Sequence, residues 1–204
     1  MNITTQAPRR PKGRPLSFDR EAVLDRAMLL FWQHGYEATS LTELTAAMGV
    51  TPPSIYTAFG DKKKLFLEAV HRYLSGPVTS ESIIGSASTA RDAAAGLLHA
   101  AAVGFTGSDT PPGCLLATSA ISCSAAAADV QEELAAIRRK IEARLKKKID
   151  SDISSGALPA GTDAAALAAH TMAVIQGMST LARDGARRDK LKRVMETAMR
   201  AWPN

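Results

Sequence analysis

The sequence is poor in aromatic residues and in cysteine, and it has no long run of leucine, isoleucine and valine. Aromatic residues make up 5% of the 204 positions, alanine is abundant, and runs of β-branched residues are scarce. This composition favours helices over sheets, so we expect an all-α fold. Hydrophobic residues at 46% and charged residues at 22% are the balance of a globular protein with a packed core.

Signatures of enzymes and metal sites are also missing. A phosphate-binding loop, a nucleophile elbow and a HExxH pair are absent, and the four histidines have no metal-ligand spacing. The two cysteines, Cys114 and Cys123, are too few for a disulfide framework. On one expected helix they would lie about 13–14 Å apart, too far to bridge, so we interpret them as core residues or pocket walls. We expect no catalytic residue, metal or cofactor, and a reducing cytoplasm.

Two charge-free stretches, 111–128 and 164–182, are long enough to consider as membrane spans. Both are rich in alanine, serine and threonine, and the second contains His170 and Gln176, so their transfer free energy falls short of that of a true span. The N-terminus is basic and lacks the apolar segment of a secretory signal. We therefore expect no membrane partner, and we interpret both stretches as buried helices.

Positive charge is in excess, with a net charge of +5 and a sequence pI near 9.4. This balance is compatible with an anionic partner such as nucleic acid or a membrane surface. Residues 1–16 form a basic arm that we expect to be disordered in isolation. Its cations would suit the narrow minor groove of A·T-rich DNA, although a solubilising tail is the plain alternative. They are Arg9, Arg10, Lys12 and Arg14.

Capping and turn residues divide the rest of the chain into helices. We expect a helix over 20–34, a short helix after a capping box of Ser40 and Glu43, a third helix that begins with Pro52 and Pro53 after Thr51, and a fourth over 62–74. Residues 75–88 are expected to be a connection. Further helices are expected over 89–105, 114–127, 129–155, 163–183 and 188–202.

The most informative unit is 40–59, in which two short capped helices flank a tight turn at Gly49. This pattern is typical of a helix-turn-helix, whose second helix enters the major groove of DNA by its N-terminal residues. A small bundle with no DNA function would have the same pattern. The exposed side of the second helix offers hydroxyls and apolar rings for phosphates, base edges and thymine methyls. These residues are Thr51, Pro52, Pro53, Ser54 and Thr57.

The stretch from Ala27 to Leu65 resembles the N-terminal signature of the TetR family of bacterial regulators. The matches include Gly35, Tyr36, Gly49 and Phe59. The resemblance covers about 17–73 and implies that Ser40, Tyr56 and Lys62 touch phosphates. It also implies that Thr42, Pro52, Pro53 and Thr57 face the groove. Thr57 and Ala58 stand where many members have an aromatic residue and a histidine, so one usual phosphate contact is in doubt.

The resemblance implies a DNA-binding domain over 17–62, followed by a helical ligand-binding and dimerisation domain over 63–204. Apolar residues around the expected helix 163–183 predict a homodimer built from the last two helices. They are Leu167, Met172, Val174, Ile175, Met178 and Leu181. A two-fold dimer predicts an inverted-repeat operator in double-stranded DNA.

Small side chains on three charge-free helix faces of the second domain predict an internal pocket for a small-molecule effector. Because those faces carry no arginine or lysine, we expect a neutral, largely apolar molecule. The expected walls are Leu97, Phe105, Cys114, Thr118, Ile121, Met172 and Gln176, with His99, His170 or Gln176 as orienting polar groups.

The charged side of the helix 129–155 includes Arg138, Arg139 and Arg144 together with three lysines. We interpret it as a solvated face, although a second DNA or membrane site would have the same composition. Two further hypotheses remain open at this point. One is a helical enzyme or small-molecule carrier with an incidental bundle, and the other is an architectural DNA-binding protein without sequence selectivity.

Overall fold

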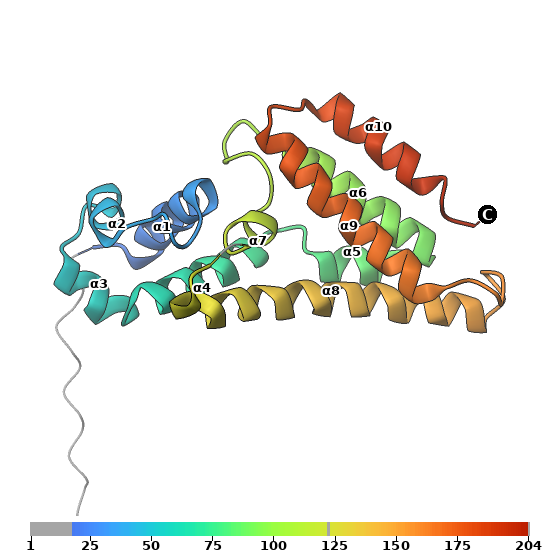
Figure 1. Cartoon of the computed structure of the whole chain (residues 1–204), viewed down its shortest axis with the longest axis horizontal. Coiled ribbons are helices and arrows are strands. Elements are labelled where there is room, and N and C mark those ends of the chain that lie inside the picture. Colours follow the sequence, from blue (N-terminus) through green and yellow to red (C-terminus); the bar gives the residue numbers. More distant parts are fainter. Residues whose placement is uncertain (1–17, 122, 204) are drawn as a thin grey trace, which may run out of the picture.

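The computed structural model describes residues 18–121 and 123–203, which form ten α-helices, one 3-10 helix and no strand. The expectation of an all-α fold is confirmed. The molecule is elongated, with a small head of helices at one end and a longer helical body at the other (Figure 1). The arm residues Arg9, Arg10, Lys12 and Arg14 lie outside the described residues.

The head consists of three helices, and a fourth leads from it into the body. Their bounds are α1 Arg20–His34, α2 Leu41–Met48, α3 Pro52–Phe59 and α4 Lys62–Leu74. Caps fix these bounds. The Asp19 carboxylate accepts from two backbone N–H groups of α1, Ser40 and Glu43 form the expected capping box of α2, and Asp61 caps α4. Thr51 precedes α3 without a side-chain cap bond.

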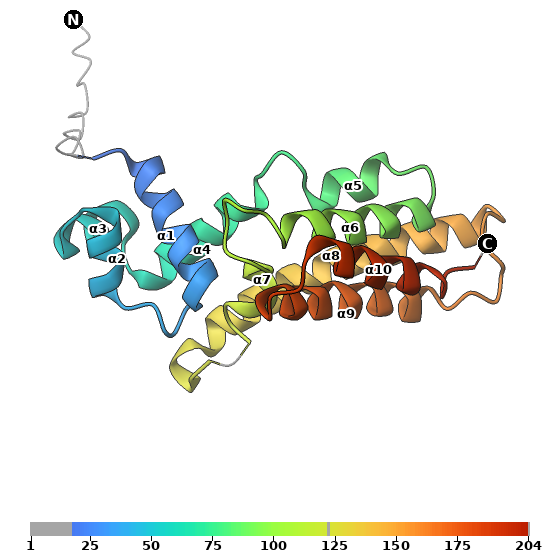
Figure 2. The same ribbon diagram turned by 90° about the horizontal axis from the view of Figure 1, so that it is seen from above.

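The body surrounds one central helix, α6 (Ala90–Gly104), which packs against four others. These neighbours are α5 (Ser80–Ser86), α8 (Ala128–Ser154), α9 (Ala164–Arg183) and α10 (Arg188–Met199). Seen from above, the long helices of the body lie side by side along the long axis of the molecule (Figure 2). The short helix α7 (Leu115–Thr118) lies between the body and the head (Figure 1), and the 3-10 helix η1 (Ala125–Ala127) directly precedes α8.

One hydrophobic cluster runs from the head into the body. Phe31 of α1 stacks edge-on against Phe66 of α4 at 5.0 Å between ring centroids, and both are fully buried. The same cluster includes Leu44 and Ile55 of the two short helices and continues to Leu98 of α6. A second cluster fills the far end of the body around Trp202. The head therefore rests on the body through shared apolar packing.

Two expectations about the helices are wrong. Residues 80–86 form α5, because Thr79 and Ser82 make a capping box and the buried Ile84 anchors the helix to the core. The expected helix over 114–127 stops at Thr118. The carbonyl of Ser119 accepts from the Tyr36 N–H of the head at 2.8 Å, so this tertiary bond takes the place of the next helical one.

By length and hydropathy alone, α9 is the one helix of the described chain that could span a membrane. It lies within the helical body, where it contacts α6, α7, α8 and α10. Its composition therefore fits a packed helix of the bundle.

Candidate nucleic-acid interface and ligand cavity

The pair α2 and α3 has the geometry of a helix-turn-helix. Gly49 ends α2 in the left-handed conformation, with φ 68° and ψ 31°, which only glycine adopts at little cost. On the inner side of the pair, Leu44, Met48 and Ile55 are buried. The turn and this shared apolar side fix the angle between the two helices, and the opposite side of α3 is free to meet a partner.

The outer face of α3 carries the predicted DNA-contacting residues. Pro52, Pro53, Tyr56 and Thr57 are exposed, and their spacing of three and four positions places them on one face of the helix. The Tyr56 side chain is the most prominent, with 51% of its surface exposed. This face can therefore enter a groove without rearrangement of the core.

Several hydroxyls of this region already have partners within the chain. Thr57 donates to the Pro53 carbonyl at 2.9 Å, and the hydroxyls of Thr51 and Ser54 lie 2.9 Å apart. Ser54 is half-buried, whereas Thr51, Thr42 and Ser40 are exposed. The surface that α3 and the preceding Thr51 offer outward thus consists of the methyl groups of Thr51 and Thr57, the proline rings and the Tyr56 hydroxyl.

Two arginines of α1 hold the ends of the two short helices. Arg26 donates to the Met48 carbonyl at the end of α2, and Arg20 donates to the Ala58 carbonyl near the end of α3, each at 3.3 Å. Arg20 also lies over the Phe59 ring, 4.4 Å from its centroid. Both cations face the negative ends of helix dipoles, which stabilises the arrangement.

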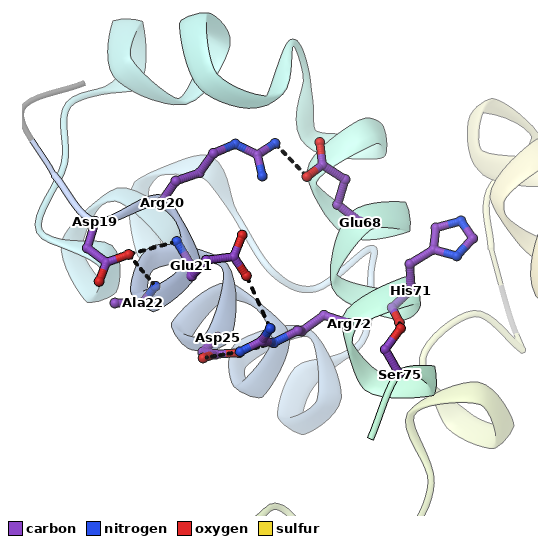
Figure 3. A network of polar contacts seen from close by, with 9 residues as sticks. All are labelled: Asp19, Arg20, Glu21, Ala22, Asp25, Glu68, His71, Arg72 and Ser75. Carbon is purple, nitrogen blue, oxygen red and sulfur yellow. Dashed lines mark hydrogen bonds and ion pairs between the residues drawn. The ribbon is translucent and has the colours of Figure 1, made fainter. Parts of the chain in front are cut away.

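Ion pairs fasten α1 to α4 (Figure 3). Arg20 binds Glu68 at 2.6 Å, and Arg72 of α4 binds Asp25 at 2.8 Å and Glu21 at 3.1 Å. Since α4 leads from the head into the body, this network connects α1 to the helix that joins the two parts.

Lys62 has a more enclosed setting than its predicted phosphate contact suggests. Its ammonium lies 4.6 Å from the centroid of the Tyr36 ring and 3.4 Å from the Glu37 carbonyl oxygen. Burial lowers the pKa of Lys62, which the nearby carboxylates of Glu37 and Glu43 partly offset. Lys62 thus lies beside the α2 N-terminus, half-buried.

The body forms direct hydrogen bonds with the end of α1. Arg183, the last residue of α9, donates to the carbonyls of Trp32 at 3.2 Å and Gln33 at 2.6 Å, and to the Thr118 hydroxyl at 2.7 Å. The Trp32 indole N–H donates to the Gly113 carbonyl at 3.1 Å, and both groups are buried. These bonds join the head to α7, α9 and the loop before α7.

Gly113 is required at this junction. Its φ of 83° lies in the region that favours glycine, and an added Cβ would lie 2.9 Å from the carbonyl oxygen of Ser179 on α9. The Ser179 hydroxyl also accepts from the Cys114 N–H at 2.8 Å. The loop before α7 is therefore pressed against α9.

A second contact between head and body lies on the other side of α7. Glu37 accepts from the backbone N–H and the hydroxyl of Ser124, at 3.0 Å and 2.7 Å. Both bonds lower the pKa of Glu37, and the bond from the Ser124 hydroxyl has the larger effect. Lys63 of α4 pairs with Asp129 at the start of α8.

A cavity of about 810 Å³ lies where the head meets the body. This volume is in the range of small-molecule sites. The body contributes residues of α5, α6, α7, α8, α9 and α10, the head contributes Met28 and Trp32 of α1, and the connecting helix α4 contributes Tyr73. A ligand in the cavity would therefore touch both parts of the molecule.

Five of the nine predicted pocket residues lie in the cavity wall. They are Leu97, Phe105, Cys114, Met172 and Gln176. The other four lie elsewhere. Because the helix ends at Thr118, that residue turns to Arg183 and Ile121 is 55% exposed. His99 is exposed on α6, and His170 is half-buried on α9 outside the lining.

The expectation of a wall without arginine or lysine is wrong, because α4, α8 and α10 contribute Arg72, Arg138 and Arg188. A sequence signal for Arg138 existed. Its position, four residues after Leu134 and three before Ile141, puts it on the apolar stripe of α8. Met28 and Trp32 of the head and Tyr73 of α4 were missed, and we find no sequence signal for their place in the wall.

Cys114 is a wall residue of the cavity and is buried. Its sulfur lies 3.4 Å from the Tyr73 hydroxyl, and burial raises the pKa of the thiol. Cys123 is half-buried, beyond the end of α7. The expected separation of about 13–14 Å assumed one helix through both cysteines. That assumption is wrong, because the helix ends between them.

Comparison with known proteins agrees with this architecture. Residues 23–69 match the model of the bacterial regulatory proteins of the tetR family, and residues 93–200 match a tetracyclin repressor-like C-terminal domain. The HTH-type transcriptional repressor ComR of Escherichia coli K12 is 36% identical over 202 residues, which are 98% of this chain and 96% of ComR.

Two solved structures share the fold along most of the chain. One is a cysteine mutant of the TetR-family regulator CifR complexed with 26-bp double-strand operator DNA, with 38% identity, a TM-score of 0.88, and coverage of 94% of this chain and 100% of that chain. The other is a putative TetR regulator from Rhodococcus sp. RHA1, with 34% identity, a TM-score of 0.62, and coverage of 89% and 98%. With matching models over both its parts and a relative similar along nearly its whole length, the chain belongs to the TetR family of bacterial transcriptional regulators.

Proposed function

We propose that this regulator acts as a cytoplasmic homodimer, represses transcription from an inverted-repeat operator, and leaves that operator when a small molecule enters the cavity. The observation that carries the proposal is the shared wall of the cavity. Its lining joins Trp32 of α1 to residues of α6, α8 and α9, so an occupant contacts the head and the body at once. The similarity to ComR, a repressor, supports repression over activation of transcription.

On the DNA, α3 enters the major groove with Pro53 and Thr57, and Thr42 of α2 lies at its edge. The hydroxyls of Ser40 and Tyr56 hold the phosphate backbone. Lys62 reaches a phosphate only by leaving the Tyr36 ring, which is a modest change for a flexible side chain. The arm residues add contacts in the minor groove. The complex of CifR with operator DNA supports the general mode.

The dimer uses the outward faces of α9 and α10. Met172 and Met178 are buried within the protomer, so they do not supply this surface. On α9, Ala165, Ala169, Ala173 and Gly177 recur at every fourth position and are exposed. Small residues in such a row let a second helix approach closely.

One experiment tests the core of the proposal. DNase I footprinting over the region upstream of the gene is expected to reveal one protected inverted repeat whose two halves lie about one helical turn or more apart. Protection of a single asymmetric site would contradict the dimeric mode. Coating of any sequence without preference would favour an architectural DNA-binding protein instead. Sedimentation at micromolar concentration is expected to give a dimer.

A further inference from the structure

We propose that the cavity recognises a carboxylate group on an otherwise apolar molecule, and that the guanidinium of Arg138 binds this carboxylate. The inference rests on the proposed function, since it takes the cavity as the effector site. It replaces the expectation of a neutral molecule.

Arg138 is a half-buried cation of the wall whose charge has no counterion. Its Nη1 donates to the Leu116 carbonyl at 2.5 Å. In the part of the chain that the structure describes, no carboxylate lies within 4.0 Å of its guanidinium. The side chain lies beside Leu116 and Ile141 of the same wall, and its burial lowers its pKa.

The other charged groups of the wall are engaged or lie on exposed residues. Arg72 is paired with Asp25 and Glu21. Arg188 is exposed and donates to the Thr106 hydroxyl at 3.2 Å. Asp109 is exposed in the loop between α6 and α7 and accepts from Ser108. Arg138 is thus the half-buried cation that faces an apolar space with donors to spare.

A guanidinium has five N–H donors in a planar fork, and the bond to Leu116 uses one nitrogen. The remaining donors match the two oxygens of a carboxylate, which arginine binds through two parallel hydrogen bonds. A cation withdrawn from water gains most from a partner of opposite charge. One guanidinium matches a single negative charge, which favours a carboxylate over a doubly charged phosphate ester.

The apolar residues of the wall favour an apolar group in the remaining part of the ligand. Leu97, Ile141, Met172 and Ile175 belong to the lining and offer only apolar surface. An alkyl or aryl group would bury itself against these side chains and place its acid group at Arg138. Trp32 of α1 and Tyr73 of α4 belong to the same lining, so the occupant would also contact the head and the helix that joins it to the body.

The test uses matched probes that differ only in the acid group. The probes are octanoate, decanoate and dodecanoate, each compared with the alcohol of the same chain length, and binding to the full chain is measured by isothermal titration calorimetry. We expect at least one carboxylate to bind roughly 10- to 100-fold more tightly than its alcohol, the range for a hydrogen bond to a charged group. Equal binding of every pair, or no binding of any probe, would overturn the proposal.

Three variants identify the residue. Arg138→Gln keeps a donor for the Leu116 carbonyl but removes the charge, and it is expected to abolish the preference for the carboxylate while leaving the alcohol affinity unchanged. Arg138→Lys is expected to retain part of the preference. Arg139→Gln is the matched control, because Arg139 is the next residue of α8, is exposed and pairs with Glu132.

If Arg138→Gln weakens acid and alcohol equally, the residue only supports α7 and the proposal fails. If Arg139→Gln removes the preference as fully as Arg138→Gln does, the assignment to Arg138 fails. None of these titrations contains DNA. A protein that binds carboxylates but no operator would therefore contradict the proposed function alone, and one that protects its operator but shows no preference would contradict this inference alone.

Discussion

The replacement of Arg183 by methionine tests whether the body holds the head through the end of α1. Methionine keeps most of the apolar stem but removes three hydrogen bonds, to the carbonyls of Trp32 and Gln33 and to the hydroxyl of Thr118. No element of the core cluster is truncated by this change. We therefore expect a folded protein with a looser junction between head and body.

The size of the effect follows from those three bonds. A hydrogen bond in a protein contributes about 0.5–1.5 kcal/mol net, so three contribute about 1.5–4.5 kcal/mol. Arg183 is partly exposed, which places the expected loss in the lower half of that range, at about 2 kcal/mol. For a chain of this length the corresponding fall in Tm is about 4–8 °C.

The assay is urea denaturation and thermal melting at one fixed protomer concentration, since dimer stability depends on concentration. Arg187→Met is the control, because Arg187 is an exposed residue of the turn between α9 and α10. A double-mutant cycle with Thr118→Val is expected to give a coupling of about 1 kcal/mol between the two side chains. A loss below about 0.5 kcal/mol, equal to that of the control, would refute the assigned role.

Four further outcomes are expected. Tyr56→Phe weakens binding to every DNA sequence by a similar factor, whereas Thr42→Ala changes the ranking of operator variants in a competition assay. Gly113→Ala lowers the free energy of unfolding by at least about 1–2 kcal/mol, because its φ of 83° suits glycine and the added Cβ meets α9. Because the pKa of Glu37 is lowered, its contact with the body stabilises the fold fully above the usual glutamate pKa of roughly 4.3. This stabilisation is lost as pH falls through the lowered pKa of Glu37. The difference in Tm between the wild type and Glu37→Gln is therefore expected to shrink in acid. Deletion of residues 1–15 reduces the salt dependence of DNA binding by about 0.9 in slope for each phosphate that the arm neutralises, and an unchanged slope would show that it neutralises none.

The head could be predicted well from the sequence because its elements are fixed locally. Asp19, Ser40 and Asp61 cap their helices through bonds to backbone groups two or three residues away, and Gly49 ends α2 by its own conformation. Such signals are visible in any short window of sequence. The outer face of α3 followed from them, because burial of Ile55 and Phe59 leaves the opposite side exposed.

The middle of the chain could not be predicted in the same way, because distant residues decide it. The stretch 114–127 is rich in alanine and charge-free, yet its backbone bonds to the head at Ser119 and its Thr118 hydroxyl bonds to α9. Propensity within the window favours a helix, and the tertiary bonds prevail. The prediction of Thr118 and Ile121 as pocket walls rested on this expected helix, and both residues lie outside the cavity lining.

The cavity also combines residues that no local pattern connects. Trp32 belongs to the first helix of the head and Gln176 to the ninth helix, yet both line the same space. For Arg138, in contrast, a local pattern did exist. Its spacing from Leu134 and Ile141 indicated an inward position, and only its charge favoured exposure to solvent. A charged residue on an apolar stripe is therefore worth treating as a site candidate before it is assigned to the surface.

The position of Trp32 bears on how an effector could act. A ligand shifts an equilibrium only by the difference in its affinity for the two states, so it must contact a group whose environment changes between them. Trp32 lines the cavity, and its indole N–H and carbonyl also bind the body at Gly113 and Arg183. An occupant that moved the indole would strain or break these bonds at the end of α1, the helix that is paired with α4. In the proposed function, Trp32 is thus the side chain through which occupancy of the cavity would reach the head.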